Sequence, residues 1–265
     1  MSTEDSAEPV LLRRNEDGVA WLTLNRPQAR NALSVALMTA LEEAITAIGR
    51  DRSVKVAVIE GAGPGFCAGH DLREMRANPG RQHYEALFAQ CARLMTGIVR
   101  LPIPVIARVH GIAAAAGCQL VATCDLAVAA ADARFAVNGI NVGLFCSTPM
   151  VALSRAVGRK AALEMLFTGD MVDAEWACAR GLVNRVVAPD ALDDAVRDLA
   201  RHLASKLRLA VAIGKEAFYR QAELALAEAY AYAGTVMTEN MLKRETEAGI
   251  DAFLAKRPPP WQTPQ

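Results

Sequence analysis

The 265-residue sequence lacks a surplus of either charge, because 29 basic residues balance 29 acidic ones. This balance gives no support for a nucleic-acid partner or for attraction to an acidic membrane surface. The six cysteines form no CxxC pair, and the acidic, polar start MSTEDSAEP differs from a secretory signal. We therefore expect a cytoplasmic protein with reduced thiols, no disulfide framework and no metal site.

The sequence also lacks a membrane-spanning segment and a nucleotide-binding loop. One apolar stretch, residues 105–130, approaches the length of a membrane span, but Gln119, Asp125 and two glycines interrupt it. The glycine-rich loop at 61–71 does not match the dinucleotide pattern GxGxxG, and no Gly-Lys-Ser/Thr occurs. We therefore expect neither a dinucleotide nor a nucleoside triphosphate as a bound cofactor.

The apolar pattern alternates between strands and helices up to about residue 190, and only helical patterns follow. Strands are expected at 10–14, 18–24, 54–59, 105–109, 126–130 and 182–187. Helices are expected after the N-cap Ser34 and at 81–99, 148–157, 160–167, 173–180, 190–203 and 209–254. With 52% hydrophobic residues to fill a core, this order predicts an α/β fold with a C-terminal helical part.

The same pattern divides the chain into four parts. We expect a disordered start at 1–8, an α/β core at 9–200, a helical part at 201–257 and a proline-rich tail at 258–265. Helical additions of this size often mediate assembly.

The stretch at 105–130 predicts a strand, a tight turn, a short buried helix and a second strand. Four small residues, Ala113 to Ala116, stand at the expected start of that helix. Small side chains allow another group to approach the backbone, and the first N–H groups of a helix have no partner within it. Such a helix start can hold a developing negative charge on oxygen. The alternative is a small-residue helix that only packs tightly in the core.

Two glycine-rich turns each follow a buried strand, the loop at 61–71 and the turn at 110–117. In α/β proteins, ligands gather at loops that follow the carboxyl ends of parallel strands. One backbone N–H from each loop can converge on a single carbonyl oxygen, which is what an enolate or a tetrahedral oxyanion needs for stabilisation.

Five segments resemble motifs of the enoyl-CoA hydratase/isomerase (crotonase) superfamily. They are NRPQARNAL at 25–33, FCAGHDL at 66–72, HGI…GCQL…CDL at 110–126, FTG at 167–169 and GLVNRVV at 181–187. The similarity extends over about residues 10–257 in one register. Within the superfamily, the runs AAAAGCQL and VGLFCSTP most resemble the poorly characterised enoyl-CoA hydratase domain-containing proteins.

The resemblance implies a crotonase-like core of repeated ββα units and a C-terminal helical part that builds homotrimers or dimers of trimers. It also implies a CoA thioester as substrate, with no metal or redox cofactor. The oxyanion hole implied by the resemblance consists of the backbone N–H groups of His70 and Ala116. The superfamily usually has glycine at the position of Ala116, and alanine is compatible there if φ stays negative.

The resemblance breaks at the two glutamates that hydratases of the superfamily use to move protons. These positions correspond to Gln119 and Gly139. A glutamine amide does not exchange a proton near neutral pH, and glycine has no side chain. General acid–base catalysis contributes roughly 10²–10⁴-fold per group, so the loss of both should remove about 5 kcal/mol or more of barrier reduction. We expect ordinary hydratase activity to be weak or absent.

Other side chains near these loops are candidates for the missing proton transfer. The imidazole of His70 titrates near neutral pH, and Asp71 is either an acid–base group or the cap of a helix that begins at Leu72. The resemblance places Cys146 and Ser147 near an alternative carboxylate of some isomerases, so they are candidate hydrogen-bonding or nucleophilic groups. The alternative is a helix cap by Ser147 or Thr148. Further polar residues in these turns, compatible with structural roles, are His110, Asn138 and Asn141.

Two sets of residues are candidates for contacts with the thioester itself. The resemblance suggests that basic and loop residues bind CoA, and that the end of the last helix covers the adenine in a neighbouring subunit. The CoA candidates are Arg26, Arg30, Ala68, Arg73, Phe253 and Lys256. The candidates for an acyl pocket, which are otherwise core residues, are Phe88, Met95, Leu144, Phe145 and Met150.

Three functions remain open from the sequence. The chain is expected to bind an acyl-CoA and to stabilise an oxyanion, as a nominal lyase or isomerase of this superfamily in fatty acid metabolism. Decarboxylation of a malonyl-type thioester or thioester hydrolysis needs little beyond the hole. The alternative from another class is a non-catalytic acyl-CoA-binding or assembly protein.

Overall fold

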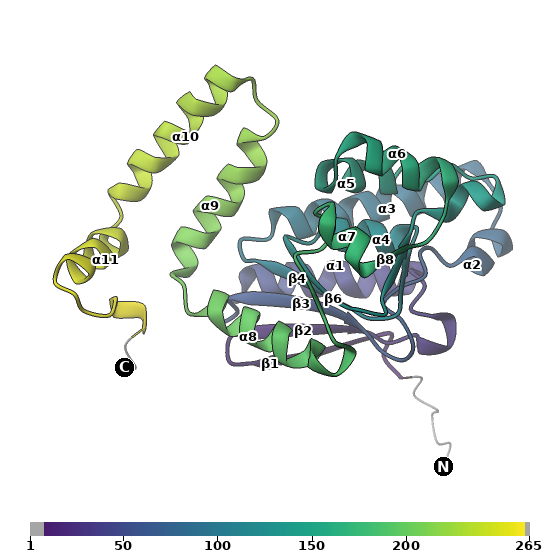
Figure 1. The fold of residues 1–265 in the computed structure, drawn as a ribbon, viewed down its shortest axis with the longest axis horizontal. Coiled ribbons are helices and arrows are strands. Elements are labelled where there is room, and N and C mark those ends of the chain that lie inside the picture. Colours follow the sequence, from purple (N-terminus) through teal and green to yellow (C-terminus); the bar gives the residue numbers. More distant parts are fainter. Residues whose placement is uncertain (1–7, 263–265) are drawn as a thin grey trace, which may run out of the picture.

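A six-stranded sheet organises the computed structural model, which describes residues 8–262 (Figure 1). The strand order is β1-β2-β3-β4-β6-β9; β1 pairs with β2 in antiparallel fashion and all other neighbours are parallel. These strands are β1 (Leu11–Glu16), β2 (Val19–Leu24), β3 (Val56–Gly61), β4 (Val105–Val109), β6 (Leu126–Ala130) and β9 (Arg185–Val187). The expected α/β class with a parallel sheet is therefore confirmed.

A smaller sheet of β5 (Ile112–Ala114), β7 (Arg134–Ala136) and β8 (Val172–Asp173) was not predicted. We expected a turn that leads directly into the short helix, but β5 lies between them and pairs in parallel with β7. A 3₁₀ helix (Asn138–Val142) follows β7. Strands of two or three residues carry too little apolar alternation to be read from sequence.

Helices cover both faces of the large sheet, because its central strands are apolar on both sides. Ala20, Leu22 and Leu24 of β2 pack in the cluster that contains α1, α3 and α4, whereas Val19 and Trp21 pack in the cluster that contains α8. The helices of the core are α1 (Val35–Arg50), α2 (Leu72–Ala77), α3 (Arg81–Arg100), α4 (Ala116–Thr123), α5 (Pro149–Ala156), α6 (Arg159–Thr168), α7 (Ala174–Ala179) and α8 (Leu192–Ala204). Ser34 caps α1 as expected, since its hydroxyl accepts the N–H of Leu37 at 3.2 Å.

The last helices extend away from this core (Figure 1). They are α9 (Arg208–Gln221), α10 (Leu226–Met241) and α11 (Arg244–Leu254), in place of one continuous helical stretch. Ala229 and Ala252 are their buried residues. Their large exposed apolar side chains are Phe218, Leu226, Tyr230, Met237, Met241, Ile250, Phe253 and Leu254.

Three further predictions concern the ends and the boundaries of the chain. The predicted disorder at 1–8 falls, apart from Glu8, outside the described residues. The predicted boundary after residue 200 falls inside α8, which packs against the sheet. In the tail, the ring of Trp261 contacts Gly249 of α11, within a last turn at Pro260–Gln262. Of the helices in residues 8–262, none has the length and apolar character of a membrane span.

Candidate functional site

The two glycine-rich turns predicted to meet do lie against each other. The N–H of Cys67 donates to the carbonyl of Ile112 at 3.0 Å, and the N–H of Ala114 donates to the carbonyl of Cys67 at 2.9 Å. Gly69 has a φ of 97°. A Cβ built on it would lie 2.9 Å from the Cβ of Ala115 and 3.3 Å from the nitrogen of Ala116. Only glycine therefore allows this loop to approach the start of α4 so closely.

Two backbone amides at this contact have no acceptor among residues 8–262. The bridge between Leu33 and His70 uses the carbonyl of Gly69 (2.7 Å) and the N–H of Asp71 (3.2 Å), so the N–H of His70 faces away from Leu33. Ala116 is the first residue of α4, where an N–H has no partner within the helix. Free donors of this kind can hold a negatively charged oxygen.

The strained residue of this turn is Ala115, whereas the sequence analysis considered the backbone conformation of Ala116. Ala115 has φ 47° and ψ −115°, a conformation that is unfavourable for any residue with a Cβ, whereas Ala116 is helical. Hydrogen bonds hold it in place: its N–H donates to the carbonyl of Ala136 at 2.8 Å, and its carbonyl accepts the N–H of Gln119 at 3.0 Å. The strain sets the direction in which α4 begins.

The side chain of His70 is the least satisfied polar group of the site. Both ring nitrogens are buried and have no hydrogen-bond partner in the part of the chain that the structure describes. The ring meets Phe88 edge to face, with 5.7 Å between ring centroids. Burial lowers the pKa of His70, and the nearby backbone of Leu33 only partly opposes this shift, so the imidazole is neutral at physiological pH.

Asp71 and His110 have the structural roles that we considered as alternatives. Asp71 caps α2 by accepting the N–H groups of Arg73 (3.1 Å) and Glu74 (3.2 Å). Its partial burial would raise the pKa of its carboxyl group, but the bond from Arg26 and the two N–H groups hold that pKa below its usual value.

Nδ1 of His110 accepts from the guanidinium of Arg108 at 3.2 Å, because a guanidinium only donates. Nε2 of His110 therefore carries the proton and donates to the carbonyl of Gly63 at 2.8 Å. This pair of bonds fastens the 61–71 loop to the end of β4.

Of the two positions that the resemblance assigns to glutamates, Gln119 lies on α4 and Gly139 follows β7, and neither carries an acid. Gln119 is 4% exposed, and its Oε1 lies 3.9 Å from the thiol sulfur of Cys91. Burial raises the pKa of Cys91 to about 12. The N–H of Gly139 donates to Sγ of Cys146 at 3.3 Å. A Cβ built on Gly139 would lie 2.8 Å from that sulfur and 2.6 Å from the carbonyl oxygen of Leu144.

Cys146 thus fills the space that a side chain at 139 would need. Burial raises the pKa of its thiol, which stays protonated near neutral pH. Ser147 is exposed and its hydroxyl donates to the carbonyl of Phe145 at 3.3 Å. The cap expected from Ser147 or Thr148 is wrong, because no side chain bonds to the first N–H groups of α5, where Pro149 fixes the first turn instead.

The predicted CoA residues fall into three groups. Arg26 is occupied by Asp71, at 2.9 Å, and by the carbonyl of Ala32. The side chains of Arg30 and Arg73 are exposed and have no partner within residues 8–262, and the N–H of Ala68 donates to the carbonyl of Arg30 at 3.0 Å. Phe253, in the last turn of α11, and Lys256, just after that helix, are both exposed. They lie at the end of the molecule opposite α2 (Figure 1).

The acyl-pocket candidates split between core and surface. Met95 packs in the core and Phe88 packs against it. A core position for the other three is wrong, because Leu144, Phe145 and Met150 are exposed. They lie on the loop and helix that follow Gly139, beside Phe167, whose ring centroid is 6.0 Å from that of Phe145.

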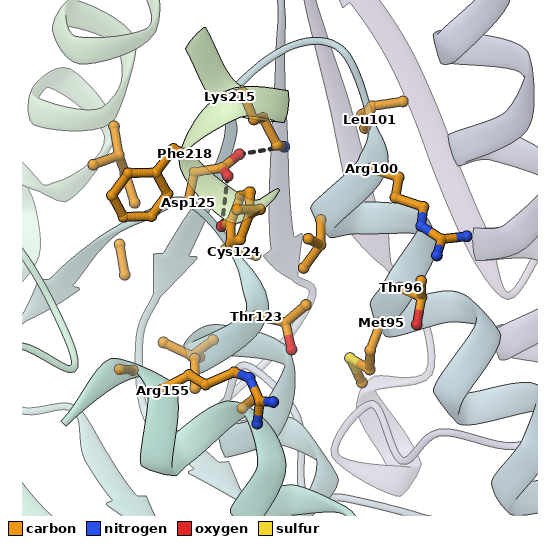
Figure 2. A pocket seen from close by; sticks show the side chains of 18 of the residues that line it. Met95, Thr96, Arg100, Leu101, Thr123, Cys124, Asp125, Arg155, Lys215 and Phe218 are labelled. Carbon is orange, nitrogen blue, oxygen red and sulfur yellow. Dashed lines mark hydrogen bonds and ion pairs between the residues drawn. The ribbon is translucent and has the colours of Figure 1, made fainter. Parts of the chain in front are cut away.

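Sequence reasoning missed an ion pair at the other end of α4. Nζ of Lys215 donates to Asp125 at 2.6 Å (Figure 2). It also donates to the carbonyls of Ile98 and Ile103, each at 3.0 Å. The hydroxyl of Tyr219 donates to the same carboxylate at 2.9 Å. These groups lie on one wall of a cavity of about 980 Å³ between α3, α4, α5 and α9. A lone lysine within a helical pattern gives no signal of this pairing.

Comparison with known proteins shows the relatives of this chain. The profile of the enoyl-CoA hydratase/isomerase family matches residues 14–264. The human mitochondrial enoyl-CoA hydratase domain-containing protein 3 is 46% identical over 94% of this chain and 82% of its own length. The 2,3-dehydroadipyl-CoA hydratase of Escherichia coli is 34% identical over 94% of this chain and 97% of its own.

A solved structure of an enoyl-CoA hydratase from Mycobacterium smegmatis superposes with a TM-score of 0.94. It is 61% identical and covers 97% of this chain and 100% of its own.

Proposed function

The chain belongs to the enoyl-CoA hydratase/isomerase family, and we propose that it binds an acyl-CoA thioester and stabilises negative charge on the thioester oxygen. The observation that carries this proposal is the pair of unpartnered amides of His70 and Ala116 on two abutting loops. Both loops follow the carboxyl ends of neighbouring parallel strands, β3 and β4, where α/β proteins bind ligands. Two N–H donors at one oxygen are the requirement for enolate or tetrahedral-intermediate stabilisation.

Ordinary hydration of an enoyl-CoA is not part of this proposal. The Escherichia coli relative is named a hydratase, but here Gln119 and Gly139 offer no proton carrier for that reaction. We expect turnover of crotonyl-CoA far below the roughly 10 s⁻¹ typical of enzymes. Reactions that need an electron sink and little acid–base help, such as decarboxylation of a malonyl-type thioester or thioester hydrolysis, remain candidates.

A second candidate function is a non-catalytic acyl-CoA-binding or assembly protein. The absence of an acid at Gln119 and Gly139 favours it. The exposed apolar side chains of α9–α11 concern assembly, because exposed apolar surface is characteristic of an interface. We propose a homotrimer or a dimer of trimers, in which Phe253 and Lys256 reach the CoA of a neighbouring copy. Light scattering after size exclusion measures the assembly, and a monomeric mass would contradict it.

The proposal requires no metal or redox cofactor. The cytoplasmic location stays a prediction from the sequence, since the human relative is named mitochondrial.

The test of thioester binding uses two glycines that differ in one respect. Gly69 and Gly143 both have positive φ, of 97° and 78°. An added Cβ crowds Ala115 and Ala116 at Gly69, but it meets nothing within 4 Å at Gly143. We expect Gly69→Ala to separate the two amides and to weaken binding of butyryl-CoA at least ~10-fold, about 1.4 kcal/mol. Gly143→Ala should bind as the unmodified protein does.

Calorimetric titration with butyryl-, crotonyl- and malonyl-CoA measures this binding, and mass spectrometry of the same mixtures follows turnover. An absence of binding to all three thioesters would refute the proposal. Equal affinities for the Gly69→Ala and Gly143→Ala variants would place the thioester elsewhere. Binding without any change of mass would favour the non-catalytic alternative.

A further inference from the structure

The imidazole of His70 forms no hydrogen bond of ordinary distance and angle within residues 8–262. Its two ring nitrogens are buried without a partner in that part of the chain. Both ring nitrogens of His110 and the carboxylate of Asp71, by contrast, form hydrogen bonds. Buried polar groups in folded proteins are almost always hydrogen-bonded, and exceptions often have a catalytic role. The ring therefore needs an explanation outside the packing of the chain.

The position of the ring links it to the thioester proposed above. The imidazole belongs to the residue whose N–H supplies one donor to the proposed thioester oxygen, so only the bonds within one residue separate the ring from that donor. Phe88 meets the ring edge to face, and neither ring nitrogen has a partner at hydrogen-bond distance in the described residues. A neutral imidazole has one lone pair ready to accept a proton, and burial keeps the ring in this form.

We propose that the imidazole of His70 is the catalytic base of this site and removes a proton from C2 of the bound acyl-CoA. This inference rests on the proposed thioester binding. A ring nitrogen takes the C2 proton, and the electron pair of the C–H bond moves to form the enolate. The negative charge comes to the thioester oxygen, held by the N–H groups of His70 and Ala116. The imidazolium then returns a proton to C2, so no co-reactant is consumed.

Electrostatics favour this pairing of acid and base forms. A buried imidazolium alone would be unstable, but here it appears together with the enolate, so the site stays neutral overall. The other groups near the amides do not compete as bases. The amide of Gln119 is not basic near neutral pH, the thiol of Cys146 is protonated, and the carboxylate of Asp71 is held by Arg26 and the start of α2.

Exchange of hydrogen for deuterium tests this step without any assumption about the physiological product. The full chain is incubated with butyryl-CoA in D₂O, and deuterium at C2 is followed by mass spectrometry and proton NMR. We expect the unmodified protein to catalyse exchange. His70→Gln and His70→Ala both keep the backbone N–H but lose the base, and should slow exchange by about 10²-fold or more. His202→Gln, which changes an exposed histidine of α8, is the matched control and should exchange normally.

Calorimetric titration of each variant with butyryl-CoA distinguishes a loss of thioester binding from a loss of the catalytic base. Retained binding with lost exchange in both His70 variants supports His70 as the base. Equal exchange in the unmodified protein and in His70→Gln would overturn the role of His70 as the base. Binding of butyryl-CoA by the unmodified protein without any exchange would overturn it too. In both cases the proposed thioester binding is unaffected. If the unmodified protein does not bind butyryl-CoA, crotonyl-CoA or malonyl-CoA, the proposed function fails and this inference fails with it.

Discussion

The two ends of α4 treat their polar groups in opposite ways. The helix has eight residues, so its ends are only about 12 Å apart. At its N-terminal end two amides and one imidazole have no partners in the described chain, and Ala115 is strained. At its C-terminal end the carboxylate of Asp125 accepts from Lys215, Tyr219 and the N–H of Val105 (2.7 Å).

The difference separates a proposed binding role at one end of α4 from a structural role at the other. Unpaired donors and strain cost stability, and the proposed thioester would supply the missing partners. At the C-terminal end of α4, where the polar groups are hydrogen-bonded, Lys215 connects α9 to the end of α3 and to the residues just before β4 and β6. These bonds attach the exposed C-terminal helices to the core. One end of α4 leaves the donors that the proposed binding requires, and the other end attaches α9.

Breaking the satisfied end should give the largest effect. Lys215→Met leaves Asp125, whose side chain is only 16% exposed, without its cation. Loss of one partner of a buried ion pair costs roughly 3–5 kcal/mol, which urea denaturation measures. Lys160→Met, at an exposed lysine of α6, is the control and should stay within about 0.5 kcal/mol of the unmodified protein.

A second variant at the same carboxylate should lower the free energy of unfolding by a smaller amount. Tyr219→Phe removes one neutral donor to the charged carboxylate and should cost roughly 1.5–3 kcal/mol. If Lys215→Met unfolds with the same midpoint as Lys160→Met, the ion pair does not attach α9 and the contrast between the two ends disappears.

Relief of strain at the other end should change stability in the opposite direction. Ala115→Gly removes a backbone strain of about 1–3 kcal/mol against about 0.4–1 kcal/mol of added unfolded-state entropy, so a net gain near 1 kcal/mol is expected. Ala122→Gly, within the same helix, should instead cost about 1 kcal/mol. Urea denaturation distinguishes the two, and a loss of equal size in both variants would show that Ala115 is unstrained.

Sequence reasoning missed the contacts at the C-terminal end of α4, but it predicted the elements around its N-terminal end. The strands β4 and β6 and the short helix between them follow from apolar runs and small residues, and so does the meeting of the two glycine-rich loops. The pairing of Asp125 with Lys215 joins residues 90 positions apart, and no local pattern encodes it.

Details of the site escaped prediction for a related reason. The strain at Ala115, the free ring of His70 and the sulfur of Cys146 beside Gly139 depend on how separate segments pack. The sequence shows which residues stand in these turns, but it does not show which of their polar atoms find partners.

The smallest expected effect is a pH dependence that belongs to the unsatisfied end alone. Burial lowers the pKa of His70 in the folded state below its value of about 6.5 in the unfolded chain. Between these two pKa values the unfolded chain binds more protons, so acid destabilises the protein as the pH falls below about 6.5. His70→Gln removes this dependence and should lose less stability between pH 7.5 and pH 5.5. Urea midpoints at both pH values measure it, with His202→Gln as control; equal losses in all three proteins would show that the ring of His70 is not buried in its neutral form.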